Sequence, residues 1–97
     1  MTREDTPVTN PVVVLREEFD DWAVLFNPDT AYALGVNPVG VAVWKLLDGK
    51  RSLGEVVALL KDSFEGVPST VEAEVLAFAD ELARHGFIGQ TSEVGSG

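Results

Sequence analysis

The sequence predicts a small α+β domain in which a three-stranded antiparallel sheet is followed by three helices. Three short runs rich in β-branched and apolar residues predict the strands, at residues 12–17, 22–27 and 31–36. Helix start and stop signals after residues 36, 51 and 68 predict the helices. A length of 97 residues with 45% hydrophobic residues fits one domain with one modest core.

Short turns between the three strands predict a meander. The first turn is the acidic segment 17–21, in which Phe19 is expected to pack inward, and the second is Pro28-Asp29-Thr30. The acidic segment lacks the alternate-residue spacing of a calcium loop, so we interpret it as a solvated hairpin tip.

Each helix has a recognisable start. Asn37 is suited to cap the first helix and Pro38 to occupy its first position, and this helix is expected to run to about Asp48. Capping boxes, in which a serine and a glutamate three residues later cap each other's amides, open the second helix at Ser52 and the third at Ser69. These helices are expected to end near residues 64 and 85, the third at Gly86.

Apolar spacing predicts the core of the domain. Both tryptophans, Trp22 and Trp44, fall within apolar elements and are predicted to be core residues. The third helix carries a stripe with helical spacing, which is predicted to face the core: Val71, Val75, Phe78 and Leu82.

The folded domain is predicted to span residues 12–89. Residues 1–11 are polar and residues 90–97 are rich in glycine and serine, so we expect a flexible N-terminal arm and a flexible tail. The chain has no signal-peptide core and no apolar run near the roughly 20 residues that span a bilayer. The expected location is therefore the cytoplasm.

Charge and composition argue against several classes of function. Sixteen acidic and seven basic residues give a net charge of −9, which repels phosphate backbones and anionic lipids, so nucleic acids and membranes are not expected partners. The chain has no cysteine, and no catalytic motif accompanies its only histidine, His85, which we interpret as a helix terminator. We therefore expect no catalytic activity, no metal and no other cofactor.

The third predicted strand, residues 31–36, is an edge of the meander without the usual protection. It contains no charge and no internal proline. Such an edge is either covered by another element or used to bind an extended peptide as an added strand, and the residues alone leave both readings open. Two further alternatives are a winged-helix nucleic-acid-binding protein, despite its acidic third helix, and an assembly protein whose bare edge pairs with a second copy as a homodimer.

Three segments together resemble the PqqD family: "LFNPDT", "GVNPVGVAVWKLLDGKRSLGEVVALL" and "VLAFADELARHGFIG". The most specific positions are Asn37, Gly40, Trp44, Leu47, Asp48 and Gly49. Two positions depart from the family pattern, since Val39 replaces a frequent threonine and Val36 a frequent leucine. The domains of this family are RiPP recognition elements, where RiPP denotes ribosomally made, post-translationally modified peptides.

The resemblance implies a winged-helix-like domain that binds the leader part of a precursor peptide between the third strand and the third helix. The domain then presents the peptide to a modifying enzyme, very often a radical S-adenosylmethionine (radical SAM) enzyme. Mapped onto this chain, the strand side of the site consists of Ala31, Tyr32, Ala33, Leu34, Gly35 and Val36. For the helix side we choose one shoulder of the third helix beside its core stripe, namely Glu72, Leu76, Ala79 and Ala83. The opposite shoulder of the helix is the alternative.

Overall fold

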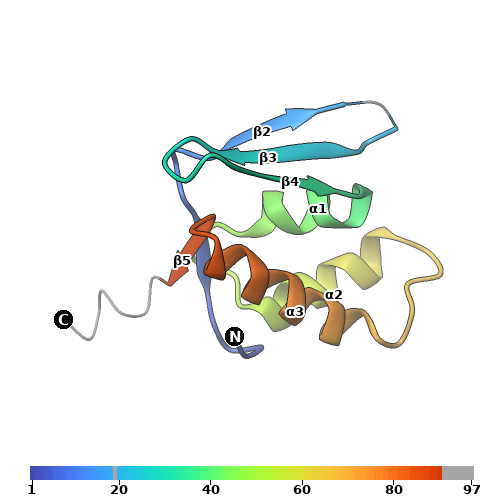
Figure 1. Ribbon diagram of the computed structural model, residues 1–97. Helices are drawn as coiled ribbons and strands as arrows, with labels where there is room; N and C mark the ends of the chain where they lie inside the picture. Colours follow the sequence, from blue (N-terminus) through green and yellow to red (C-terminus); the bar gives the residue numbers. More distant parts are fainter. Residues whose placement is uncertain (19, 91–97) are drawn as a thin grey trace.

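The fold has two layers, a sheet lying over a group of helices (Figure 1). The computed structural model describes residues 1–18 and 20–90. The sheet contains β2 (Val14–Glu17), β3 (Ala23–Asn27) and β4 (Tyr32–Val36), and the helical layer contains α1 (Pro38–Leu46), α2 (Leu53–Ser63) and α3 (Val71–Arg84). The predicted α+β class, three antiparallel strands followed by three helices, is confirmed.

The strand order is β2-β3-β4, so β4 is an edge strand as the meander predicts. The turn between β3 and β4 ends at Ala31, whose φ of 61° lies in the left-handed region. Ala31 therefore belongs to the turn, and the strand that was expected to begin there begins at Tyr32. The predicted contact of Phe19 lies outside the described residues.

The helix starts agree with the sequence in two of three cases. The Asn37 side chain accepts a hydrogen bond from the Gly40 amide at 2.8 Å, and Ser52 and Glu55 form the predicted capping box. The expected capping box of α3 is absent. This helix begins one residue later than that motif requires, after Thr70, whose hydroxyl donates to the Glu74 carboxylate at 2.7 Å instead of capping the backbone.

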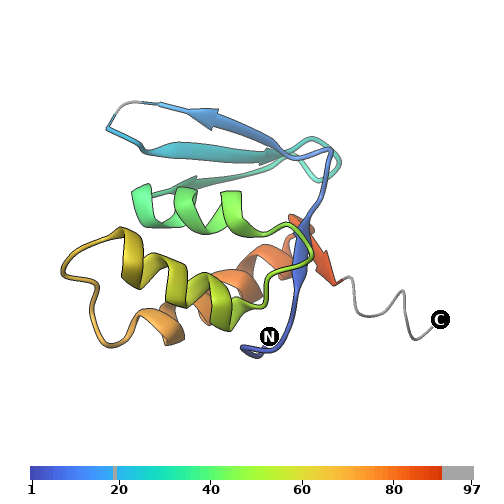
Figure 2. The same cartoon turned by 180° about the vertical axis from the view of Figure 1, so that it is seen from behind.

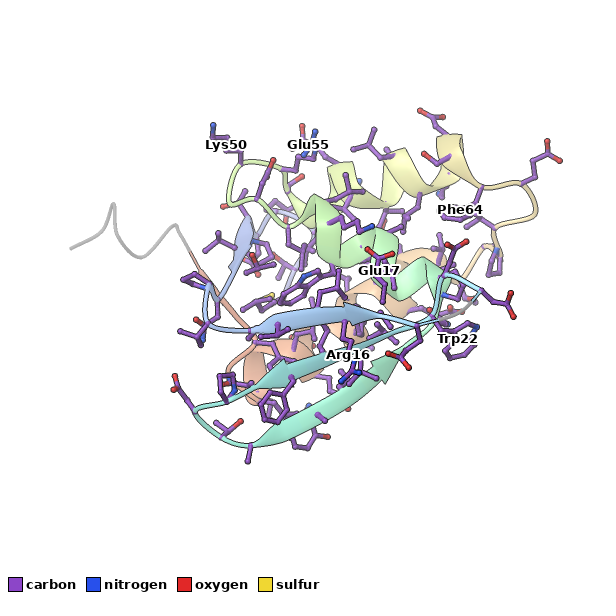
Figure 3. The ribbon with its side chains drawn as sticks, turned by 90° about the horizontal axis from the view of Figure 1, so that it is seen from above. Arg16, Glu17, Trp22, Lys50, Glu55 and Phe64 are labelled. Carbon is purple, nitrogen blue, oxygen red and sulfur yellow. The ribbon has the colours of Figure 1, made fainter. Side chains whose placement is uncertain are left out.

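The core lies between the sheet and the three helices. Leu25 of the sheet is fully buried and belongs to the same hydrophobic cluster as Leu53 and Leu60 of α2 and Leu82 of α3. Trp44 is a core residue as predicted, with 8% of its surface exposed. Trp22 is not, because it lies at the tip of the β2–β3 hairpin, where half of its surface is exposed (Figure 3).

The N-terminal residues form a strand that the sequence did not predict. β1 (Pro7–Thr9) pairs with β5 (Ile88–Gln90) in a separate antiparallel sheet at one end of the helical layer (Figure 2). The carbonyls of Asp5 and Arg3 accept hydrogen bonds from Leu53 and Gly54, the first two amides of α2. These amides have no partner inside the helix, so the segment caps α2. Residues 1–11 are therefore not the structureless arm that was expected, whereas residues 91–97 of the predicted tail lie outside the described residues.

The described helices include none that is long and apolar enough to cross a membrane.

Candidate peptide-binding groove

The outer edge of β4 presents backbone groups that no other strand of residues 1–18 and 20–90 uses. The Glu18 amide donates to the Trp22 carbonyl at 2.7 Å, so these two residues form a hydrogen-bonded pair of the β2–β3 hairpin. Bonded and non-bonded pairs alternate in antiparallel strands, so the residues of β3 that bond to β4 are the ones between those that bond to β2. Their partners on β4 are Tyr32, Leu34 and Val36. The N–H and C=O groups of Ala33 and Gly35 consequently point to the open edge.

The side chains of β4 divide in the same alternating way. Tyr32, Leu34 and Val36 face the helices and are half-buried or buried, whereas Ala33 and Gly35 lie on the outer face and are exposed. A Cβ atom added to Gly35 would meet no atom within 4 Å. The outward-facing side chains of β4 are therefore small, and the whole strand is uncharged.

A cavity of about 400 Å³ opens between the end of β4, α1 and α3. Its volume falls in the range of pockets that hold small molecules or peptide side chains. Leu34, Gly35 and Val36 line it from the strand, and the end of α2 and the loop that follows close one side. Phe64, at the C-terminal end of α2, belongs to this side (Figure 3).

The floor of the groove is the first turn of α1, which passes close to β4. A Cβ atom at Gly40 would lie 3.2 Å from the Val36 Cβ and 3.5 Å from the Phe78 ring. Glycine at this position therefore allows α1, β4 and α3 to come together. This is a structural reason for one of the residues on which the family resemblance depends.

The α3 wall of the groove combines an apolar face with acidic residues. Val71, Val75 and Phe78 provide the apolar surface, and Glu74 and Glu81 lie on the same side of the helix. Phe78, which was predicted to be a core residue, is only half-buried and lines the cavity. The shoulder of α3 that lines the groove, with Glu74, Phe78 and Glu81, is thus opposite to the shoulder chosen from the sequence.

The four helix residues chosen from the sequence lie away from the cavity. Ala79 has no exposed surface and belongs to the core, and Leu76 and Ala83 are half-buried against that core. The Glu72 carboxylate accepts a hydrogen bond from the Arg3 guanidinium at 3.0 Å. The N-terminal amine also pairs with Asp80, so Met1 and Arg3 both contact this shoulder. These contacts have no local sign in the sequence, because the segment is polar and has the composition of a flexible arm.

The N-terminal end of β4 contacts the C-terminal end of α3. The rings of Tyr32 and His85 stack with 3.9 Å between their centroids and 6° between their planes. The Asn27 side chain, only 2% exposed, donates to the carbonyls of Gly86 and His85 and accepts from the Asp29 amide. Tyr32 thus helps to close this end, and Ala31 lies in the turn beside it.

The titratable residues of the groove are acidic. Among the described residues, three carboxylates line it, those of Glu65, Glu74 and Glu81. Within residues 1–18 and 20–90, no group of three histidine or acidic side chains is arranged to hold a metal ion. The arrangement is that of a surface that accepts apolar side chains beside a free strand edge.

Comparison with known proteins fits this geometry. The family model described as "Coenzyme PQQ synthesis protein D (PqqD)" matches residues 23–88, which include β3, β4 and all three helices. The chain belongs to the PqqD family. No curated protein sequence matches it.

Two solved structures are similar to this PqqD-family chain. The first, "TbiB1 in Complex with the TbiA(beta) Leader Peptide", is 26% identical with a TM-score of 0.68, and the match covers 84% of this chain and 93% of that one. The second, "Lasso peptide synthetase B1 complexed with the leader peptide", is 17% identical with a TM-score of 0.69, covering 87% and 98%. At 17% identity, the second comparison is evidence for the fold only.

Proposed function

We propose that this protein binds the leader part of a ribosomally made precursor peptide as a strand added to β4. The observation that carries the proposal is the open, uncharged edge at Ala33 and Gly35, which borders an apolar groove. In strand addition the main-chain hydrogen bonds supply affinity, and pockets for alternate side chains supply selectivity. The 26%-identical TbiB1 structure contains a leader peptide, which supports the same role here.

The bound peptide would have two faces. Alternate side chains of the added strand would enter the groove over Val75 and Phe78, and the others would lie on the outer sheet face beside Ala33 and Gly35. Bulky side chains at these two positions would crowd the second set. The small residues of β4 therefore suit a site in which the partner's backbone lies against the strand.

The chemistry is assigned to a partner enzyme. The groove contributes carboxylates and apolar side chains, and the described residues that line it include no histidine, lysine, serine or threonine that would act as a base or nucleophile. We infer a non-catalytic peptide chaperone that presents the precursor to a modifying enzyme. The resemblance to the PqqD family leads us to propose a radical SAM enzyme as that partner.

A second candidate function uses the same edge for pairing with another copy of the chain. The open edge of β4 favours it, because any extended backbone can add to such an edge. Self-pairing would bring together two chains with a net charge of −9 each. The resulting repulsion disfavours self-pairing relative to the binding of a flexible peptide. If it occurs, the leader should compete with it.

Calorimetry with the two halves of a precursor peptide encoded beside this gene tests the proposal. The leader half is expected to bind with a Kd on the order of 1 μM, about −8 kcal/mol, because part of the interaction energy orders the peptide. The core half is expected not to bind. Sedimentation of the same samples reports whether the leader dissociates a dimer. Equal binding of both halves, or binding of neither, would contradict the assigned role.

A further inference from the structure

We infer that the groove selects leader peptides with basic side chains on both sides of an apolar one, and that Glu74 and Glu81 make this selection. The inference rests on the proposed function, because it concerns the side of the added strand that faces α3. It names a class of partner: a leader segment with the pattern basic-x-apolar-x-basic.

The groove is lined by acidic residues without a matching base. In the part of the chain that the structure describes, its lining includes Glu65, Glu74 and Glu81 but no lysine, arginine or histidine. None of the ion pairs of the described residues involves these three carboxylates. Glu74 accepts one hydrogen bond, from the Thr70 hydroxyl. The groove therefore carries uncompensated negative charge, which attracts cationic side chains and repels acidic ones.

The two α3 glutamates lie beside Phe78 on the helix surface. At 100° per residue, Glu74 and Glu81 project within about 20° of each other, with Phe78 about 40° further toward the core face of α3. Phe78, Val71 and Val75 thus form the apolar part of the wall, and the glutamates lie toward its outer margin. An apolar leader side chain suits the middle of this wall.

The spacing of the two glutamates matches the spacing of side chains on an added strand. Glu74 and Glu81 are seven residues apart in α3, which corresponds to about 10 Å along the helix axis. Groove-facing residues i and i+4 of an extended peptide are about 13 Å apart, with residue i+2 between them. Lysine and arginine side chains are long enough to span the difference between the spacing of the peptide residues and the spacing of the two glutamates. Residues i and i+4 would then meet the carboxylates, and residue i+2 would meet Phe78.

Selection from a random peptide library tests this inference even when the sequence of the precursor is not known. A display library of random 12-residue peptides would be selected in parallel on four immobilised proteins. These are the wild type, Glu74→Gln/Glu81→Gln, a charge-matched control, and Ala33→Pro. The control, Glu17→Gln/Asp62→Asn, removes two charges from exposed positions that do not line the groove. Glutamine at position 74 can still accept the Thr70 hydrogen bond.

The wild type and the control are expected to enrich peptides with lysine or arginine two residues before and after an apolar residue. The Glu74→Gln/Glu81→Gln variant should keep the apolar preference and lose the basic one. Its Kd for a peptide selected on the wild type should rise about tenfold at low salt, and this difference should shrink at high salt.

Two results would overturn the inference while leaving strand addition intact. One is enrichment of apolar residues without basic ones on the wild type. The other is an equal loss of basic residues in the charge-matched control, which would assign the preference to net charge alone. A different result would count against strand addition on β4 itself, namely an Ala33→Pro selection that yields the same peptides with the same affinity as the wild type.

Discussion

Replacing Ala33 with proline is expected to raise the Kd for the leader at least tenfold while the domain remains folded. The Ala33 amide points to the open edge of β4. In the proposed strand addition, proline would remove a donor to the peptide and place its ring where the peptide backbone would lie. The internal β3–β4 ladder does not use this amide, and proline is tolerated at such positions of edge strands. Calorimetry gives the affinity and circular dichroism gives the melting temperature.

The opposite edge of the sheet supplies a matched control. Glu17, at the end of β2, has the equivalent alternation, so its amide points away from β3. Glu17→Pro should leave leader affinity unchanged, although it removes the ion pair between Glu17 and Lys45. The same loss of affinity in both variants would mean that the prolines act through general damage to the sheet.

Replacing Asn27 with alanine is expected to lower the free energy of unfolding by about 2 kcal/mol. Its buried amide connects the β3–β4 turn to the end of α3, with 3.2 Å to the Gly86 carbonyl and 3.0 Å to the Asp29 amide. Alanine removes these part-buried hydrogen bonds and leaves the Asp29 amide without its side-chain acceptor. This connection also holds β4 and α3 together at the closed end of the groove, so leader affinity should fall as well. Urea denaturation measures the change in stability.

Two further variants separate the donor role of Asn27 from simple loss of packing. Asn10 also donates to the Gly86 carbonyl, at 3.0 Å but from a more exposed position, and Asn10→Ala should cost less than about 1 kcal/mol. Asn27→Asp keeps the size and the acceptor but places a buried negative charge against two carbonyl oxygens. It should be less stable than Asn27→Ala at pH 7 and recover at acid pH, when the carboxyl is protonated. Equal stability of the two variants at pH 7 would argue against the donor role.

Much of the sheet and helical layer was predictable from local signals. Strand positions followed from β-branched runs, and the starts of α1 and α2 followed from side chains that bond to nearby amides at Asn37 and Ser52. Such bonds depend on residues three apart and need no tertiary information. The pairing of β1 with β5 joins the two ends of the domain through three-residue strands, and nothing local distinguishes these from polar termini.

The strand side of the groove was predictable from the sequence and the helix side was not. The sequence predicts an uncharged edge strand at residues 31–36, and the structure places Tyr32–Val36 at the edge of the sheet. The helical period defines two shoulders beside a core stripe but does not say which one faces β4. In the structure, Arg3 contacts Glu72 on one shoulder, and the other shoulder lines the groove. Two residues were misplaced for this reason. Phe78, predicted to be a core residue, lines the groove, and Ala79, predicted to line the groove, lies in the core.

The edge of the sheet that receives the peptide can be identified directly by hydrogen exchange at single amides. With the leader bound, the amides of Ala33 and Gly35 should exchange markedly more slowly than in the free protein. The outward amides of the other edge, Leu15 and Glu17, should exchange at unchanged rates. Slower exchange at Leu15 and Glu17, with Ala33 and Gly35 unaffected, would contradict strand addition on β4.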